Sequence, residues 1–236
     1  MLGEIHDNPD GHRLRLERVM QLIAQGPKPV VAMEQFDLQA QPALDLALSA
    51  CKDVDCVIAK AGGPGWAWGF YKPFVQLALD QKIKLVAANM SHADVRQVMT
   101  LGFSAVFTPH TIADYQLQQI PAQVLTAQSQ SIQEGHCNRL PAQAIGPMVQ
   151  VQIARDVGMA KVIDGVKNHR VILIAGNGHV RKDAGVFQWL SHGNQAHTQV
   201  HGYVEHAEKS DAQWFDHVDV IAPAQREDPC QVFHPK

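Results

Sequence analysis

Acidic and basic side chains follow three short apolar runs of this sequence. The segments concerned are Gly3-Glu4-Ile5-His6-Asp7-Asn8-Pro9, Val30-Val31-Ala32-Met33-Glu34, and Gly176-Asn177-Gly178-His179 after Val171-Ile172-Leu173-Ile174-Ala175. If the runs are parallel strands of one sheet, their carboxyl ends meet at one edge, where open α/β sheets bind ligands. We therefore expect Glu4, His6, Glu34 and His179 to lie in one pocket.

Two carboxylates and two imidazoles at one place favour either of two chemistries. They can bind a divalent ion, or they can activate a water as in an esterase-like or peptidase-like hydrolase. For Glu4 and His6, which share one face of an extended chain, the alternative is a buried hydrogen bond that fixes the strand end. That alternative is the commoner one for the pair alone. Buried carboxylates are costly unless they are paired or bound to metal, so polar groups at three strand ends favour a site.

An aromatic cluster lies in and directly after the glycine-rich segment 62–69. Its members are Trp66, Trp68, Phe70, Tyr71 and Phe74. The default interpretation is a satellite core. The alternative is a wall for a planar hydrophobic ligand, with the Tyr71 phenolate on an iron atom. Asp156, on a predicted helix, belongs either to a solvated face or to the support of a histidine.

Hydrophobic periodicity predicts the elements that position these residues. Strands are expected over 28–33, 84–88, 104–107, 170–175, 198–204 and 217–221, and helices over 9–26, 41–49, 71–81, 92–101, 147–166 and 186–190. Asn8 followed by Pro9 is typical of a helix start. A strand, a helix and a second strand in succession predict a parallel crossover unit and hence an α/β fold. The segment Gly176 to Arg181 does not match a dinucleotide-binding fingerprint, because Arg181 stands where the fingerprint requires a third glycine.

The length of 236 residues fits a single domain over 1–236. Residues 108–146 are Gln-, Pro- and Ala-rich and predict an insertion of short helices and loops, a plausible lid or partner surface. An extended tail is expected from about residue 222. A net charge of -3 argues against a nucleic-acid partner.

Neither the cysteines nor the ends of the chain add a strong signal. The four cysteines form no Cys-x-x-Cys pair, so we expect ordinary thiols, with a small Cys51–Cys56 loop as the alternative. No run is long enough to span a membrane, and no leader precedes the first motif. Because only two residues precede Gly3, the first strand has almost no body, and we expect a longer natural precursor.

Taken together, the motifs resemble the ChaN-like family of bacterial haem-binding, iron-regulated lipoproteins. The residues that carry the resemblance are Gly3 to Asn8, Ala32-Met33-Glu34-Gln35-Phe36, Trp66 to Pro73, His136-Cys137, Gln152, Arg155-Asp156, Met159-Ala160, Gly176 to His179, and Arg226-Glu227-Asp228-Pro229-Cys230. They cover nearly the whole chain. The family is similar to a superfamily that includes erythromycin esterases, Tiki-type metalloproteases and TraB proteins, which share an early glutamate motif and a later Gly-x-x-His motif.

The resemblance implies a three-layer α/β/α fold and haem held between two subunits with tyrosine on the iron. It further implies a homodimer in the bacterial cell envelope, in the periplasm or at the outer membrane, that serves haem or iron uptake or storage with membrane-associated machinery. Tyr71 is the tyrosine that lies on a recognised motif, and Tyr115, Tyr203 or a histidine are the alternatives. Haem binding is thus the leading hypothesis. The rival is a hydrolase that uses Glu4, His6, Glu34 and His179, alone or with a divalent ion.

Overall fold

Parallel strands form the centre of the molecule. The computed structural model describes the chain through residue 232, except for the side chains of Pro229 and Val232. The strands are β1 (Val30–Asp37), β2 (Lys84–Asn89), β3 (Val171–Ile174), β4 (His201–Val204) and β5 (His217–Val220). One sheet has the order β2-β1-β3 and the other pairs β4 with β5, all in parallel. Leu2 bridges β3 at Ile174 and β4 at His201, and so connects the two sheets.

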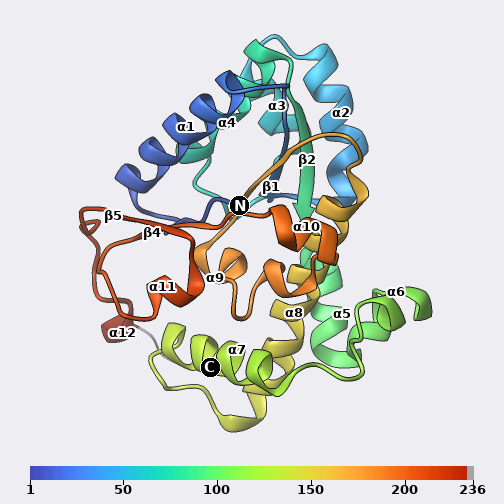
Figure 1. Cartoon of the computed structure of the whole chain (residues 1–236), viewed down its shortest axis with the longest axis vertical. Coiled ribbons are helices and arrows are strands. Elements are labelled where there is room, and N and C mark those ends of the chain that lie inside the picture. The colour runs from blue at the N-terminus through green and yellow to red at the C-terminus, as the bar shows by residue number, and fades with distance from the viewer. Residues whose placement is uncertain (233–236) are drawn as a thin grey trace.

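Helices cover both faces of the sheet (Figure 1). On one face, Val31, Met33 and Ile174 share a core with α1 (Pro9–Ala24), α2 (Gln41–Ala50), α3 (Val54–Ala61) and α4 (Trp68–Gln81). On the other face, Ala32 and Leu173 pack with α7 (Ala122–Gly135) and α8 (Ala142–Gly165), and α5 (His92–Leu101) packs beside α8. Burial on both faces explains why the strands read as continuous apolar runs. The predicted three-layer α/β/α class is confirmed.

Helix starts follow the local signals in the sequence. The Asn8 side chain accepts a hydrogen bond from the Gly11 N–H at 3.0 Å, and Pro9 occupies the first helical position of α1. Ser91 caps α5 in the same way through the Asp94 N–H. The predicted bounds of α5 agree with the structure, and those of α1 differ by two residues at the end.

Three predicted elements differ from the structure by more than a few residues or in kind. The strand expected over 104–107 is wrong, because Gly102 at φ 77° turns the chain into the 3-10 helix η2 (Phe103–Ala105), and Phe107 packs against the α8 core. The helix near 186–190 is the 3-10 helix η3 (Val186–Trp189). The long helix begins at Ala142 rather than Pro147, since Pro141 provides an earlier start and α8 continues through Pro147.

The remaining elements are η1 (Leu38–Ala40), α6 (Pro109–Asp114), α9 (Asn177–Val180), α10 (His192–His197), α11 (Asp211–Trp214) and α12 (Pro229–Val232).

Segment 108–146 contains α6 and α7, and the buried Val124 and Ile132 tie α7 into the core beneath α8. Residues 222–228, in the segment predicted to be an extended tail, have no regular structure, and α12 follows. The tail is held by Arg226, which forms ion pairs with Asp7 at 2.7 Å and with Glu205 at 2.5 Å. The final four residues of the predicted tail lie outside the described residues.

In the part of the chain described, no helix is both long and apolar enough to cross a bilayer.

The cysteines form two disulfides, so the expectation of ordinary thiols is wrong. Cys51 pairs with Cys56 between α2 and α3, with Cα atoms 5.7 Å apart, which is the small loop weighed as the alternative. Cys137 pairs with Cys230 across 93 residues, with Cα atoms 5.5 Å apart. A pairing at that sequence separation depends on the tertiary approach of α7 and the tail, and spacing alone does not encode it.

Candidate functional site

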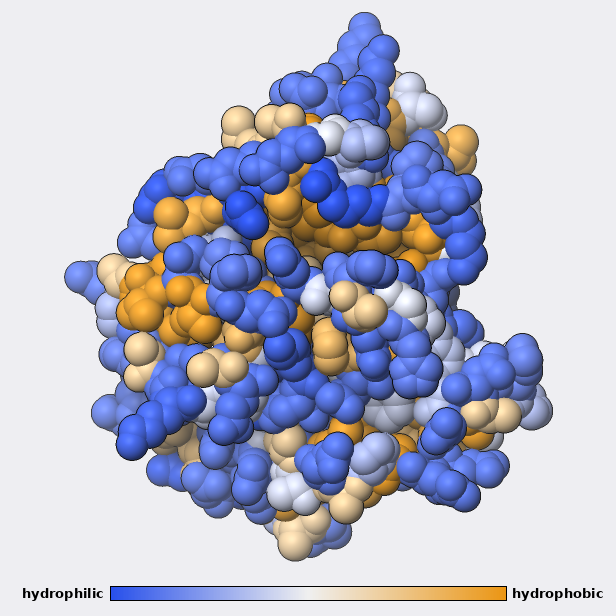
Figure 2. Space-filling view, in the orientation of Figure 1, coloured by the Kyte–Doolittle hydropathy of each residue, from blue (hydrophilic) through white to orange (hydrophobic). Residues whose placement is uncertain are grey.

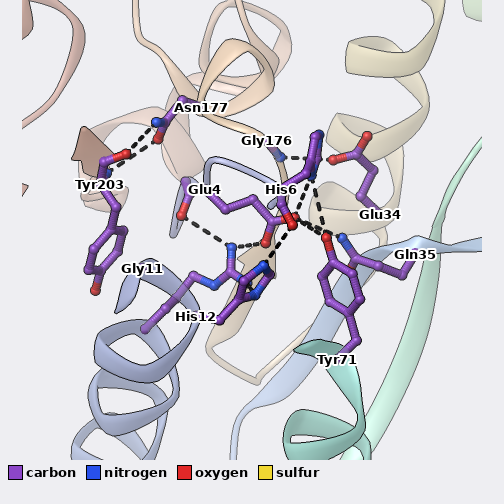
Figure 3. A network of polar contacts seen from close by, with 12 residues as sticks. Glu4, His6, Gly11, His12, Glu34, Gln35, Tyr71, Gly176, Asn177 and Tyr203 are labelled. Atoms are coloured by element: carbon purple, nitrogen blue, oxygen red, sulfur yellow. Dashed lines mark hydrogen bonds and ion pairs between the residues drawn. The ribbon is translucent and has the colours of Figure 1, made fainter. Parts of the chain in front are cut away.

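The carboxyl ends of the strands converge around the backbone of Gly176. Glu34 follows the last β1 residue paired with β3, Met33, and its Oε2 accepts the Gly176 N–H at 2.8 Å. A Cβ added at Gly176 would lie 3.0 Å from His6 Nε2 and 3.8 Å from Glu34 Oε2. A side chain at position 176 would crowd the His6 ring, at the point where the His6 side and the Glu34 side of the cluster meet. Figure 3 shows Gly176 with Glu34 on one side and His6 and Glu4 on the other.

Glu4 is the centre of one side of the cluster. Its Oε1 lies 2.6 Å from His6 Nδ1, accepts the Tyr71 hydroxyl at 2.6 Å and accepts Gln35 Nε2 at 3.4 Å. The carboxylate also forms an ion pair with Arg15. His6 remains half-exposed, with 51% of its side chain accessible, while Glu4 is buried. Solvent therefore reaches this side of the cluster through the His6 ring.

Arg15 brings a buried positive charge from α1. Its side chain is fully buried, it contacts His12 Nδ1 at 2.7 Å, and its guanidinium lies 5.1 Å from the centre of the Phe74 ring. Burial lowers the pKa of Arg15 to about 10, so the group remains charged at neutral pH. His12 in turn bonds the His6 carbonyl at 2.9 Å, which ties α1 to the motif that precedes it.

His179 is the centre of the other side. Its Nδ1 lies 2.6 Å from Asp156 Oδ1, and its Nε2 lies 3.6 Å from Glu34 Oε1. Asp156 comes from α8, and its second oxygen accepts Gln128 Nε2 from α7 at 3.0 Å. Gln128 is fixed by a further bond to the Ala184 carbonyl at 3.1 Å. The imidazole is thus held between two carboxylates, and one of them is itself positioned by the insertion.

Electrostatic interactions among His179, Asp156 and Glu34 shift the pKa of each of these side chains. Burial lowers the pKa of His179, but Glu34 and Asp156 outweigh burial and raise the pKa above its ordinary value. Burial raises the pKa of Asp156 to about 6 against the opposing effect of His179. Burial also raises the pKa of Glu34, but His179, His6 and the Gly176 N–H lower it overall. A histidine between two carboxylates is suited to hold or to move a proton.

Asp156→Asn is expected to lower the pKa of His179 by roughly one unit or more, because it removes a charge 2.6 Å from Nδ1. The raised pKa of His179 in the folded state stabilises the fold fully below the unfolded value near 6.5, and this contribution is lost as pH rises through the folded pKa. The variant should therefore lose part of this pH dependence. NMR titration of the His179 ring measures the shift directly.

The matched control for this titration is Asp219→Asn, which removes the carboxylate 3.0 Å from His201 Nε2 outside the cluster. It should move the titration of His201 and leave that of His179 unchanged. An Asp156→Asn protein with an unshifted His179 would contradict the assigned contact.

The aromatic residues mostly pack around the cluster. Tyr71 is 1% exposed, and Phe74 is also buried. Trp66 meets the His6 ring at 5.3 Å, and Phe70 stacks on His12 at 4.6 Å. Burial raises the pKa of the Tyr71 phenol, which stays protonated and donates a hydrogen bond to Glu4. In this arrangement the Tyr71 oxygen is not open to an iron atom, so its role as a haem ligand stays a prediction.

The divalent-ion alternative finds no support in the geometry. Among residues 1–232, no group of three or more His, Cys, Asp and Glu side chains is arranged to hold a metal ion. Both carboxylates of the cluster already have positively charged or titratable partners. Glu4 is neutralised by Arg15 and Glu34 faces His179, so neither carboxylate needs a metal ion to balance its charge.

The structure adds residues that the motif analysis missed. Arg15 lies four residues after Gly11 and four before Val19, both buried, so a charge on this stripe signals a buried partner. No comparable signal marks Gln128, because its contact with Asp156 joins two helices that are distant in the sequence. Asp156 does support a histidine, which was one of the two interpretations of that position.

The sequence and the fold of this chain were compared with those of known proteins. Residues 1–190 match a family model described as haem-binding uptake, Tiki superfamily, ChaN. The solved structure of cofacial haem binding to ChaN of Campylobacter jejuni has a TM-score of 0.72 at 19% identity, covering 92% of this chain and 84% of that chain. An erythromycin esterase in its open conformation has a TM-score of 0.48 at 12% identity, covering 86% of this chain and 69% of that chain. No functionally curated sequence matches. At 19% identity, the match to the Campylobacter jejuni protein shows a shared fold.

Proposed function

The chain belongs to the haem-binding uptake family of the Tiki superfamily that includes ChaN, and on this premise we propose that it binds haem for uptake or storage of haem or iron. The observation that carries the proposal is the family match over residues 1–190. The fold shared with the haem-binding protein of Campylobacter jejuni agrees with it.

The expected haem site at the aromatic loop requires a rearrangement. For Tyr71 to bind iron, its hydroxyl must leave Glu4, and the ring must move out from under Trp66, whose centre lies 5.5 Å away. The wall residues Trp66, Trp68 and Phe70 are half-buried and therefore present only part of their surface to a porphyrin. As folded here, the residues around Tyr71 do not fit a haem with tyrosinate on its iron. Tyr115 is half-buried, whereas Tyr203 is buried.

We propose further that two copies of the chain cover the ligand in the bacterial cell envelope, where membrane-associated machinery would exchange it. A flat ligand with one open face is shielded most simply by a second subunit. The two disulfides support an oxidising compartment such as the periplasm or the outer-membrane surface.

Titration with ferric haem tests the proposal. We expect a shifted Soret band, high-spin phenolate features, weaker binding after reduction of the iron, and a shift toward dimer in sedimentation. The chain has three tyrosines, so Tyr71→Phe, Tyr115→Phe and Tyr203→Phe together examine every phenolate. Loss of the phenolate features in one variant identifies the ligand, and the other two serve as matched controls.

A protein with no Soret shift and no change in assembly would contradict haem binding. Phenolate features that survive in all three variants would contradict tyrosinate ligation and direct the search to histidine.

A second candidate function is hydrolysis, favoured by the placement of His179 between Asp156 and Glu34. Asp156 fixes the orientation of the imidazole, and Glu34 lies 3.6 Å from its Nε2, where a water could lose a proton to this pair. Neighbouring His6 is half-exposed and Glu4 orients its ring, so a substrate carbonyl would approach from this side. This activity needs no rearrangement of Tyr71.

A further inference from the structure

One cation beside the strand-end cluster has no partner in the fold. Arg155 directly precedes Asp156 on α8, and it forms no hydrogen bond or ion pair with any residue that the structure describes. Its Nε is buried without a hydrogen bond, whereas its two terminal nitrogens remain open to solvent. A guanidinium carries five N–H donors and stays protonated at any physiological pH. The bonding capacity of Arg155 is therefore unused within the described chain.

The helix α8 places this arginine at the mouth of the cluster. Four residues that are three or four positions apart share one face of the helix, namely Gln152, Arg155, Asp156 and Met159. Met159 and Asp156 are buried, while Gln152 and Arg155 are partly exposed. Figure 1 shows α8 running past the arrowhead of β2 toward α7. This face of α8 thus leads from the core to solvent beside the carboxyl ends of the strands.

Carboxylates of β1 lie near the Arg155 charge without pairing with it. Burial raises the pKa of Asp37, and the charges of His92 and Arg155 oppose that rise. Burial also acts to raise the pKa of Glu34, and Arg155 is one of the charges that lower it overall. Because the guanidinium forms an ion pair with neither carboxylate, its terminal nitrogens remain available to an anion from outside the chain.

The chemistry around Arg155 favours one class of anion. A planar guanidinium binds a carboxylate or a phosphate through two parallel N–H···O bonds. Glu34 and Asp37 repel a dianionic phosphate more strongly than a singly charged carboxylate. The Gln152 amide, one turn away on the same face, has no partner among the described residues and adds a neutral donor. A single carboxylate is therefore the best match.

We propose that Arg155, with Gln152 beside it, binds a carboxylate of the ligand and so holds the rest of that ligand at Glu34 and His179. The inference rests on the proposed function, because haem carries propionate carboxylates and a substrate of the hydrolase candidate can carry a carboxylate of its own. Arg155 is a positioning residue in either case, since it binds a group remote from the iron or from the reacting carbonyl.

Butyrate tests the carboxylate subsite without haem and without turnover. At constant ionic strength, we expect butyrate to shift the Arg155 Nε–H and the His179 ring signals in NMR, with saturation at millimolar concentrations. The buried Nε is shielded from water, so its N–H reports on a ligand bound to the terminal nitrogens. Butyramide has nearly the same shape without the charge and should cause no such shift. Asp37→Asn removes a nearby negative charge and should tighten butyrate binding by about twofold or more.

Arginine variants show whether the guanidinium is the binding group. Arg155→Gln should weaken butyrate binding at least about tenfold, followed at the His179 ring. Arg155→Lys keeps the charge but loses the planar fork, so it should retain part of the affinity.

The matched control is an arginine at the opposite edge of the sheet. A groove of about 770 Å³ lies there and contains Arg18. Figure 2 shows this hollow beside the amino terminus that Figure 1 marks. Arg18→Gln should leave the response of the His179 ring to butyrate unchanged, because the groove is remote from the cluster.

Ferric haem and its dimethyl ester distinguish the two sources of the carboxylate. If Arg155 binds a propionate, Arg155→Gln weakens binding of ferric haem at least about tenfold and leaves binding of the ester unchanged. If Arg155 binds a substrate, both porphyrins bind Arg155→Gln as they bind the parent. The variant then raises KM for an activated ester that ends in a free carboxylate, with kcat nearly constant and with no effect on the matching neutral ester.

His179 signals that do not respond to butyrate, or that respond equally to butyramide, would overturn the proposal. So would a butyrate response that survives Arg155→Gln. Haem that fails to bind any form contradicts the proposed haem function and leaves the butyrate comparison unaffected.

Discussion

Arg15→Met is expected to lower the free energy of unfolding by about 3–5 kcal/mol, the cost typical of breaking a buried ion pair from one side. Arg15 and Glu4 are both buried and form an ion pair at the start of α1. Without the guanidinium, the Glu4 carboxylate keeps the Tyr71 hydroxyl as a donor but has no full countercharge. Urea unfolding followed by circular dichroism measures the loss.

Arg13→Met is the matched control, because it makes the same substitution two positions away on the same helix. Arg13 pairs with Glu17 at 2.9 Å, and both side chains are more than half exposed. Its loss should cost less than about 1 kcal/mol. The double variant Arg15→Met, Glu4→Gln should recover part of the stability, since it removes both charges. Equal losses for Arg13→Met and Arg15→Met would contradict the buried pair.

His179→Gln is expected to reduce any hydrolysis by roughly 10²–10⁴-fold, the usual contribution of a positioned acid or base. Glutamine keeps a polar group between Asp156 and Glu34 but cannot exchange a proton as imidazole does. The loss should appear in kcat while the protein still folds, with a lower stability because the pairing of His179 with Asp156 and Glu34 is removed. It is measured on a panel of activated esters and peptides, with circular dichroism and Tm as checks on the fold.

His201→Gln is the control for this measurement. His201 also pairs with an aspartate, at 3.0 Å, but it lies at the opposite edge of the sheet from the cluster. Its replacement should leave turnover within a fewfold of the parent. The hydrolase candidate fails if the parent protein turns over no substrate above the buffer rate. Haem titration of His179→Gln separates the two candidate functions, because the proposed tyrosinate ligation does not use His179.

Tyr71 shows how packing distinguishes two interpretations of one motif. A tyrosine beside tryptophans on a glycine-rich segment is by default part of a satellite core, and the alternative is a wall for a planar ligand. The structure turns the hydroxyl inward to Glu4 at 2.6 Å and covers the ring. Exposure of a side chain depends on what packs over it, and this information is absent from the local pattern.

The fold class could be predicted from the sequence because strand and helix periodicities are local. Apolar runs at Val30 and Val171 predict strands buried on both faces, and Asn8 with Pro9 determines the start of α1. The failed strand over 104–107 shows the limit. A short apolar run does not show whether a neighbouring strand is present to pair with it. Here Gly102 turns the chain into a 3-10 helix instead.

The sequence by itself determined that Glu4, Glu34 and His179 follow apolar runs, which is sufficient to place them at one edge of a parallel sheet. Only the tertiary structure decided their partners. Arg15, Asp156 and Gln128 come from three helices, and the Cys137–Cys230 disulfide joins residues 93 positions apart. Local periodicity fixes which face a residue occupies, whereas a contact between distant segments depends on the packing of whole helices against the sheet.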